Sequence, residues 1–348
     1  AIVPLMKQVI AKNDTIQKDY NTRNYPEDIQ EGFCRFLSGY LGFDHNRGVI
    51  AESEHPFTTS LHNHDVRITN HYYSDNLESA MFSAIHETGH ALYEMGVDDA
   101  LSGTPAGTGI SMGMHESQSR FYENMIGRSK EFWEPLFSKL KDTYPEELSD
   151  VSLEDFIAGI NKAEPGPIRT EADELTYPLH IMIRYELEKD LIAENCKVSD
   201  LPELWNKKYK DYLGITPKDA SEGVLQDIHW SGASFGYFPS YALGSAYGAQ
   251  FLACMEKDLD VYGLVREGNL QPIVDWLTEK IYRHACMYDP KPLFESVVGA
   301  EFDPHYFTDY LEKKIENVIE GNNKKSSSSV VRTKTKKEAD KKTQKKKV

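Results

Sequence analysis

The spacing of apolar residues in most of this chain is that of α-helices with one buried face. One such helix is predicted to begin after Ser74-Asp75-Asn76, with Glu78 completing a capping box, and to end at Gly96 as a C′ glycine. Its apolar positions are Leu77, Met81, Ala84, Ile85, Leu92 and Met95. Similar spacing predicts helices over 174–196, 240–259, 270–288 and 303–320. The sequence therefore predicts a mainly α fold.

Residues 55–72 depart from this helical pattern. Two short runs with β-branched residues, 55–61 and 65–69, flank a polar turn at 62–64. They predict an antiparallel β-hairpin just before the helix over 77–95, and little strand elsewhere. The edge of such a hairpin can pair with an extended peptide backbone. The histidines of this segment are expected to be solvated or bonded to the backbone rather than to bind a second metal; they are His55, His62, His64 and His71.

The helix over 77–95 contains His86-Glu87-Thr88-Gly89-His90, two histidines four residues apart with a glutamate beside the first. Positions four apart lie on one face of a helix, so both imidazoles can reach one zinc ion while Glu87 lies beside the attacking water. This layout is typical of zinc peptidases. The alternative is a buried helix whose histidines are satisfied by core hydrogen bonds, and a third ligand would argue against it.

A catalytic zinc site takes three protein ligands and leaves one position open. The metzincin continuation needs a glycine at 93 and a histidine at 96, and this chain has Tyr93 and Gly96 there. The other solution is a carboxylate from a following helix. A Gly-rich loop over 102–109 is followed by a helical segment that runs from about 114 to 127 and contains Glu116. Glu116 is the preferred third ligand, with His115 as a hydrogen-bonding partner of the ligands. Competing candidates are His115 itself, Glu94 and Asp98.

Four segments occur in the order HETGH (86–90), HESQ (115–118), IRTEAD (168–173) and GVLQDIHW (223–230). Together they closely resemble the hallmark motifs of the carboxypeptidase Taq family of zinc metallocarboxypeptidases, and the resemblance extends over about residues 32–321. It implies a large helical metallopeptidase domain with a deep groove, a small antiparallel hairpin or sheet near the zinc helix, and frequent homodimers. It also implies removal of single residues from peptide C-termini.

Members of this family normally carry a further N-terminal helical segment ahead of the point where this chain begins. The chain is therefore expected to be a fragment or a shortened relative. Exposed apolar surface near residues 1–30 would be the physical sign of the missing segment.

The resemblance also implies roles for individual residues. His86, His90 and Glu116 match the metal ligands, with Zn²⁺ as the expected ion and Co²⁺ as a substitute. Glu87 matches the general base, which takes a proton from the attacking water and later passes it to the leaving amine.

Arg169 is the candidate clamp for the terminal carboxylate of a substrate, because a planar guanidinium binds a carboxylate through two hydrogen bonds. The alternative for Arg169 is a salt bridge with a nearby acidic residue, namely Glu171, Asp173 or Glu174.

The last motif and the tyrosines after it supply further candidates. His229 is a candidate donor to the developing oxyanion, and Gln226 and Asp227 are candidates to orient it or to contact the substrate. Tyr241, preferred over Tyr237, is a candidate phenol for the oxyanion. A structural role is an equal alternative for each of them.

Charge and composition limit the remaining classes. Residues 1–320 contain 28 Lys and Arg against 53 Asp and Glu, whereas residues 321–348 contain 11 against 2. We therefore expect one acidic helical domain over 1–321 and a disordered basic tail over 322–348, with no nucleic-acid partner. The four cysteines have no metal-type spacing, and no apolar run is long enough for a membrane span, so a cytoplasmic location is expected.

The sequence thus predicts a zinc metallocarboxypeptidase that acts on peptides with a free C-terminal carboxylate. Two alternatives stay open. A zinc endopeptidase would share the metal residues but would not need Arg169. An inactive homologue would keep zinc as a structural element or serve as a binding protein.

Overall fold

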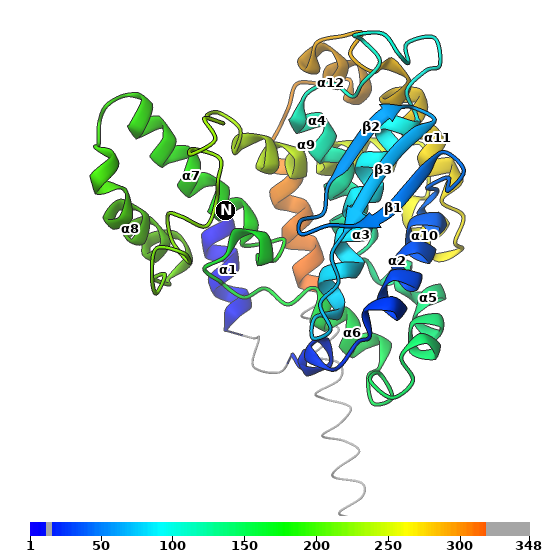
Figure 1. Cartoon of the computed structure of the whole chain (residues 1–348), viewed down its shortest axis with the longest axis horizontal. Helices are drawn as coiled ribbons and strands as arrows, with labels where there is room; N and C mark the ends of the chain where they lie inside the picture. The colour runs from blue at the N-terminus through cyan, green and yellow to red at the C-terminus, as the bar shows by residue number, and fades with distance from the viewer. Residues whose placement is uncertain (12–15, 318–348) are drawn as a thin grey trace, which may run out of the picture.

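The computed structural model describes residues 1–11 and 16–317, and these residues are mainly helical, as predicted (Figure 1). The α-helices are α1 (Ile2–Ile10), α2 (Glu27–Leu41), α3 (Leu77–Met95), α4 (Met112–Arg120), α5 (Lys130–Thr143), α6 (Leu153–Ile160), α7 (Tyr177–Ile192), α8 (Leu201–Leu213), α9 (Pro239–Met255), α10 (Val261–Arg266), α11 (Gln271–Lys280) and α12 (Pro290–Val298), followed by helical residues 305–317. Short 3₁₀ turns are η2 (Asp19–Thr22), η4 (Arg169–Glu171), η5 (Val198–Asp200) and η6 (Tyr282–His284), and a π-helical turn, η3 (Phe121–Ile126), continues α4.

The sheet has three strands, β1 (Gly48–Glu52), β2 (Thr58–His62) and β3 (Asp65–Asn70), in the order β1-β3-β2. The predicted antiparallel hairpin is confirmed as β2 and β3. The sequence did not predict β1, which pairs parallel to β3 and makes the sheet mixed. Gly48 allows this pairing, since a Cβ at this position would lie 2.3 Å from the carbonyl oxygen of Val66.

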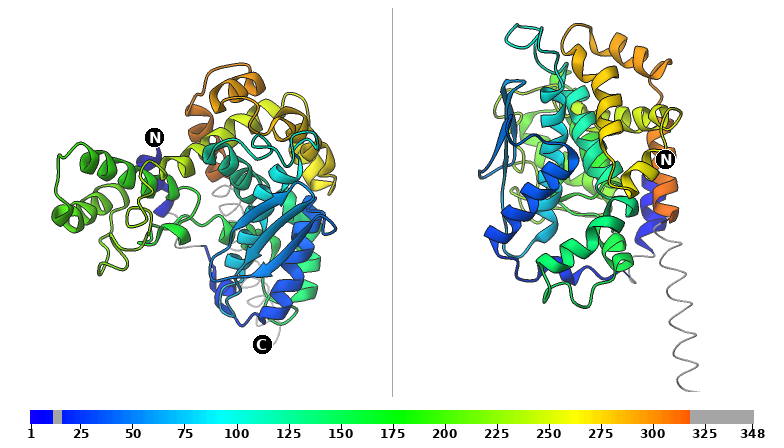
Figure 2. Two further views of the ribbon diagram at one scale, coloured as in Figure 1. Left: turned by 45° about the horizontal axis from the view of Figure 1, so that its top comes forward. Right: turned by 90° about the vertical axis from the view of Figure 1, so that its right-hand side faces the viewer.

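The sheet covers one side of α3 (Figures 1 and 2). Val66 and Ile68 on the inner face of β3 pack against Ala91 and Met95 of α3. On its other sides α3 packs against α2 and α4, so almost every residue of α3 is buried. Packing alone therefore holds the helix that carries the histidines on several sides.

The ends of α3 lie where the sequence predicts them, although neither the capping box with Glu78 nor the C′ glycine is found. The Glu78 carboxylate accepts a hydrogen bond from the Tyr20 hydroxyl and pairs with Lys18 instead. The Asn76 side chain accepts a hydrogen bond from the Ser79 backbone N–H and caps the helix. Gly96 is not a left-handed C′ glycine, since its φ is −83°. A Cβ on Gly96 would lie 2.6 Å from the Cβ of Tyr282, so this glycine allows close packing instead of terminating the helix.

The other predicted helices within the described residues are present with shorter bounds; the one over 303–320 is seen as helical residues 305–317, and its positions 318–320 lie outside the described residues. The segment over 174–196 contains α7, and the segment over 240–259 contains α9. The segment over 270–288 is divided, because α11 ends at Lys280 and Ala285 has a φ of 43°, which a helix does not allow. The basic tail over 322–348 lies outside the described residues.

Apolar exposure near the N-terminal end differs from the expectation. Helix α1 buries Met6 and Val9. Ile29, at 39%, is the exposed large hydrophobic side chain among described residues 1–11 and 16–30. Exposed apolar residues lie instead on α7 and in the loop before α9, including Met182, Tyr185, Leu225 and Ile228.

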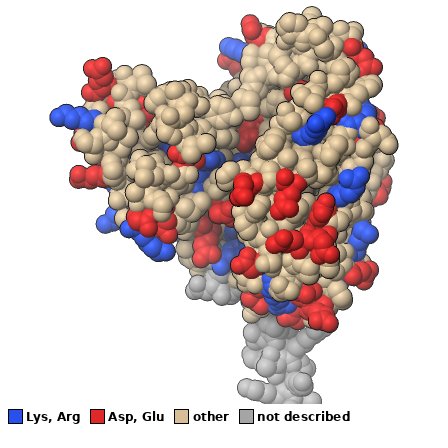
Figure 3. Space-filling model, viewed as in Figure 1, with Lys and Arg blue, Asp and Glu red and all other residues tan. Residues whose placement is uncertain are grey.

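Helices α7 and α8 project from one side of the molecule (Figures 1 and 2). Figure 3 shows that the surface is hollowed between this projection and the part that carries α12 and the sheet. Within the described residues, none of the helices combines the length and the apolar character that crossing a membrane would need.

Candidate metal centre and active site

Helices α3 and α4 bring three potential metal ligands together. Nitrogen atoms of His86 and His90 and a carboxylate oxygen of Glu116 all lie within 4.8 Å of one another. Oε2 of Glu116 is 3.1 Å from Nε2 of His90 and 3.6 Å from Nε2 of His86. Two imidazoles and one carboxylate form a donor set that suits zinc. Among the described residues this is the one such group of three His, Cys, Asp or Glu side chains.

Each histidine is oriented through its other ring nitrogen. Nδ1 of His86 lies 2.8 Å from Oε2 of Glu123. Nδ1 of His90 lies 3.1 Å from Nδ1 of His115, and Nε2 of His115 lies 2.6 Å from Oε1 of Glu94. These bonds assign the proton of both His86 and His90 to Nδ1, so that each Nε2 is left as a lone pair facing Glu116.

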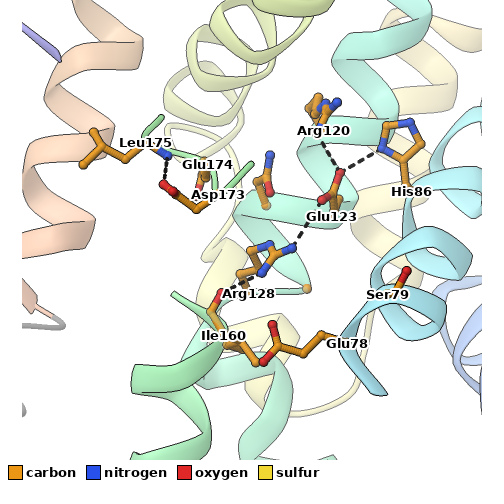
Figure 4. A network of polar contacts seen from close by, with 12 residues as sticks. Glu78, Ser79, His86, Arg120, Glu123, Arg128, Ile160, Asp173, Glu174 and Leu175 are labelled. Atoms are coloured by element: carbon orange, nitrogen blue, oxygen red, sulfur yellow. Dashed lines mark hydrogen bonds and ion pairs between the residues drawn. The ribbon is translucent and has the colours of Figure 1, made fainter. Parts of the chain in front are cut away.

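Glu123 is held between two arginines (Figure 4). Oε2 of Glu123 accepts a hydrogen bond from Arg120 Nη1 at 3.1 Å, and its Oε1 lies 3.5 Å from Arg128 Nη2. Burial alone would raise the pKa of Glu123, but the charge of Arg120 and the hydrogen bond with His86 lower it to about 2. Glu123 is therefore a fixed carboxylate that orients His86.

The carboxylate of Glu116 is fixed in the same way. The Ser119 hydroxyl donates to Oε2 at 2.9 Å, and Arg120 Nη2 lies 3.4 Å from Oε1. Burial opposes ionisation, yet the charge that His86 carries when it is also protonated at Nε2 and the charge of Arg120 hold the pKa of Glu116 well below its ordinary value. Helix α9 passes so close that a Cβ on Gly244 would lie 2.6 Å from the Cβ of Glu116.

The remaining residue of the motif, Glu87, is oriented by the sheet. Glu87 lies on α3 between the two histidines and is buried. The hydroxyl of Thr58 on β2 lies 2.6 Å from Oε2 of Glu87 and 3.1 Å from its backbone carbonyl oxygen. Strand β2 is an edge strand of the sheet. The edge of the sheet therefore lies directly beside the carboxylate that the sequence nominates as a general base.

The candidate substrate residues form a second buried cluster. Asp227 lies between two arginines: its Oδ1 accepts from Arg169 Nε at 3.0 Å and Nη2 at 2.7 Å, and its Oδ2 accepts from Arg184 Nε at 2.6 Å. Burial would raise the pKa of Asp227, but the hydrogen bond from Arg169 and the charge of Arg184 lower it from its ordinary value.

Of the three acidic residues proposed as alternative partners of Arg169, Glu171 is exposed and the other two are engaged elsewhere. Asp173 accepts from the backbone of Leu175 and Thr176 and from the Thr176 hydroxyl, and Glu174 pairs with Lys314.

Gln226 and His229 occupy different environments in this cluster. Gln226 bonds to backbone groups, accepting from the Arg169 N–H at 2.8 Å and donating to the Glu222 carbonyl at 2.7 Å, which indicates a structural role. Nε2 of His229 lies 3.1 Å from the Tyr241 hydroxyl. Burial lowers the pKa of His229 and raises that of Tyr241, which keeps both groups neutral near pH 7.

Tyr177 and Arg120 connect the two clusters. The Arg120 guanidinium lies 4.2 Å from the centroid of the Tyr177 ring, and the Tyr177 hydroxyl accepts from Arg169 Nη1 at 3.1 Å. Arg120 in turn contacts Glu116. The candidate clamp and the candidate metal centre therefore belong to one continuous site.

Five residues of this site were missed in the sequence: Thr58, Arg120, Glu123, Tyr177 and Arg184. Glu123 carried a usable signal, because it follows Glu116 by two helical turns and so lies on the same side. Arg184 follows Tyr177 by two turns in the same way. No local pattern distinguishes Thr58 from other strand residues.

The competing ligand candidates have other partners. His115 and Glu94 bind each other, and Asp98 accepts a hydrogen bond from the Ala100 N–H on the surface.

The fold and the site define the class: a mainly helical protein with an HExxH metal centre completed by a glutamate from the following helix. The chain belongs to the carboxypeptidase Taq (M32) metallopeptidase family, whose sequence model matches residues 1–315. The resemblance noted in the sequence is thereby confirmed.

Known relatives support this assignment. The chain is 47% identical over 319 residues to carboxypeptidase 1 of Bacillus subtilis (strain 168), an overlap of 91% of this chain and 64% of that protein. It is 44% identical over 293 residues to thermostable carboxypeptidase 1 of Thermus thermophilus, which covers 84% of this chain and 57% of that protein. The chain thus spans less than two thirds of the length of these relatives.

Solved structures agree. The crystal structure of the M32 carboxypeptidase from Deinococcus radiodurans R1 matches with a TM-score of 0.89 at 37% identity, covering 92% of this chain and 64% of that one. Trypanosoma cruzi metallocarboxypeptidase 1 matches with a TM-score of 0.85 at 35% identity, covering 90% and 66%.

Proposed function

We propose that this protein is a zinc metallocarboxypeptidase that releases single amino acids from the free C-terminus of peptides. The observation that carries the proposal is the continuity between the His86, His90 and Glu116 group and the Arg169 cluster through Arg120 and Tyr177. A metal centre and a carboxylate clamp in one site are what an exopeptidase needs. The names of the relatives agree with this activity.

His86, His90 and Glu116 would hold the zinc ion. Their donor atoms face one another, and the Nδ1 atoms of both histidines are already engaged by other partners. Zinc, when bound, supplies a Lewis acid for the scissile carbonyl and lowers the pKa of the attacking water.

Glu87, oriented by Thr58, takes the proton of the attacking water and passes it to the leaving amine. Tyr241 and His229, both neutral, are the proposed donors to the oxyanion that develops on the carbonyl.

Arg169 would bind the terminal carboxylate. Asp227 holds Nε and Nη2 on one side of the guanidinium, and Tyr177 accepts from Nη1, which fixes the plane of the group. Arg184 is fully buried beneath it and shares the charge of Asp227. The shared carboxylate leaves this pair of arginines with net positive charge, which favours a negatively charged substrate end.

The substrate backbone would lie along β2. This strand is an edge of the sheet, and its residue Thr58 contacts Glu87. An extended peptide that adds to the edge through main-chain bonds would have its scissile bond beside the general base, with no demand on its side chains.

The test is mass spectrometry of a mixed peptide set, each peptide as free acid and as C-terminal amide, after incubation with zinc-loaded protein. We expect stepwise shortening of the free acids alone. Glu87→Gln should lose about 10²-fold or more of this activity, which excludes a contaminating peptidase. Arg169→Ala should lose about 10- to 100-fold, as expected for a hydrogen-bonded charge, while the exposed Arg67→Ala serves as the matched control.

Other outcomes would identify the alternatives. Internal cuts in both acids and amides, insensitive to Arg169→Ala, would make the protein an endopeptidase. Zinc binding without any cleavage by the wild-type chain would assign the metal a structural role.

A further inference from the structure

The C-terminal helical residues 305–317 carry a lysine that is largely buried against the site. The side chain of Lys314 is 16% exposed, and its Nζ donates to three oxygens. These are Oε2 of Glu174 at 2.5 Å, the backbone carbonyl of Asn124 at 2.9 Å and the hydroxyl of Tyr310 at 3.2 Å. Burial lowers the pKa of Lys314, while the charge of Glu174 opposes this. A buried ammonium group loses its hydration, so it needs these particular hydrogen-bond partners to remain charged.

One partner belongs to the π turn η3, which carries Glu123. A π turn closes wider hydrogen-bonded rings than an α-helix, as shown by the bond from the Gly127 N–H to the Tyr122 carbonyl at 2.7 Å. The neighbouring carbonyls accept side-chain donors instead. Asn124 receives Lys314 and Tyr310, and the Met125 carbonyl receives the hydroxyl of Tyr262 at 3.4 Å. These donors satisfy backbone oxygens of the turn that aims Glu123 at His86.

The other partner belongs to the segment that carries Arg169. Glu174 directly follows the IRTEAD motif, and Asp173 fixes the turn around it by accepting from the Thr176 and Leu175 backbone. Figure 4 shows Asp173 and Glu174 close to the Glu123 network, with Arg128 between that network and the Ile160 carbonyl. Lys314 therefore contacts both the turn that carries Glu123 and the segment that begins at Arg169.

We propose that Lys314 is a positioning residue that holds these two parts of the active site in register. It acts on His86 through the η3 turn and Glu123, and on Arg169 through Glu174. This inference rests on the proposed function for its catalytic consequences, but its effect on the metal centre stands independently. Residues 190 positions apart in the chain are joined by this contact, so no local element substitutes for it.

The test compares Lys314→Met with Lys313→Met in the 348-residue chain. Lys313 is adjacent and exposed, so it controls for the loss of a positive charge from the same helix. The measurements are zinc affinity by chelator competition, kcat and KM on free-acid peptides at saturating zinc, and the free energy of unfolding. We expect Lys314→Met to weaken zinc binding by about 3- to 10-fold, somewhat less than substitution of a direct partner of a ligand. We expect kcat to fall while the control remains at wild-type values.

A purely structural lysine would give a different result. If Lys314→Met lowers stability but leaves zinc affinity and kcat equal to those of Lys313→Met, the proposal is wrong. Tyr310→Phe removes one donor to the Asn124 carbonyl without leaving a buried charge, and it provides the second variant should Lys314→Met not fold. Its zinc affinity should fall by about twofold or more, and an unchanged value would overturn the proposal.

The zinc measurement also separates the proposed carboxypeptidase function from the positioning role of Lys314. A wild-type chain that binds zinc but cleaves no peptide would refute the carboxypeptidase assignment while leaving the positioning role to be decided by zinc affinity alone.

Discussion

The hydroxyl of Thr58 orients the candidate general base, Glu87. It contacts both the carboxylate and the backbone carbonyl of Glu87, and it comes from an edge strand, not from the zinc helix. A glutamate side chain on a helix has several rotamers, and the contact with Thr58 selects one of them. A side chain from the sheet that selects this rotamer is therefore part of the apparatus for proton transfer.

Thr58→Val keeps the shape of the side chain and removes this contact. We expect kcat to fall by about 10-fold, in the range of losses seen for groups that orient a reacting side chain, with little change in KM. Zinc affinity should be unchanged, because Thr58 touches none of the three ligands. Thr59→Val, the exposed neighbour on the opposite face of β2, is the control. Equal rates for the two variants would show that Glu87 does not need the contact.

At the scale of elements, the site depends on helices that approach unusually closely. A Cβ on Gly89 of α3 would lie 2.7 Å from the carbonyl oxygen of Gln118 on α4, and a Cβ on Gly244 of α9 would lie 2.6 Å from Glu116. Glycines thus bring α3, α4 and α9 into backbone contact around the ligands. Gly89 stands inside the HExxH motif, so the motif also supplies the close approach of α3 to α4.

Gly244→Ala tests whether this contact positions Glu116. The added methyl group must displace either α9 or the Glu116 backbone, so we expect at least a 10-fold loss of zinc affinity together with lower stability. Gly32→Ala in α2 is the control, because a Cβ there meets nothing within 4 Å. That control should be more stable than the wild type by about 0.5–1 kcal/mol and should bind zinc normally. Unchanged zinc affinity in Gly244→Ala would show that α4 holds Glu116 unaided.

Elements were predictable from the sequence where the signal was local. The bounds of α3 followed from its cap and its apolar stripe, and the β2–β3 hairpin followed from two adjacent β-branched runs. Strand β1 was missed because its partner, β3, lies beyond an intervening strand, and parallel pairing leaves no turn signature. The π turn that carries Glu123 was also invisible, since its carbonyls are satisfied by Tyr262, Tyr310 and Lys314 from far along the chain.

At the scale of the whole molecule, the metal centre could be predicted from local spacing, whereas the substrate cluster depends on long-range contacts. His86, His90 and Glu116 could be nominated from spacing because two neighbouring helices supply them. The partner of Arg169 could not, because Asp227 lies 58 positions away and competes with closer carboxylates that the fold turns to other donors. Charge complementarity within a motif predicts that an arginine is paired, but only the tertiary structure decides with which residue.

The packing of α7 against α8 creates a neutral histidine that makes stability depend on pH. His180 is fully buried, and its Nδ1 lies 3.0 Å from the Tyr209 hydroxyl, which also accepts from Arg184 Nη1 at 3.2 Å. The hydroxyl therefore donates its proton to Nδ1, so the His180 proton resides on Nε2. Burial, together with the charges of Arg184 and Arg169, lowers the pKa of His180 from 6.5 to about 3.

Below about pH 6.5 the unfolded chain therefore binds a proton at His180 that the folded protein does not bind until about pH 3. The free energy of unfolding must therefore decrease as the pH is lowered through this window, by about 1.4 kcal/mol per pH unit. Urea unfolding of the zinc-free protein at about pH 7.5 and about pH 5.5 should show this loss in the wild type. His180→Asn should be less stable at the higher pH but should lose about 1.4 kcal/mol less between the two conditions. The control is His305→Asn, at an exposed position, which should keep the wild-type difference in the free energy of unfolding between the two pH values. If His180→Asn showed the same pH dependence as the wild type, the folded protein would accommodate a charged imidazole between α7 and α8.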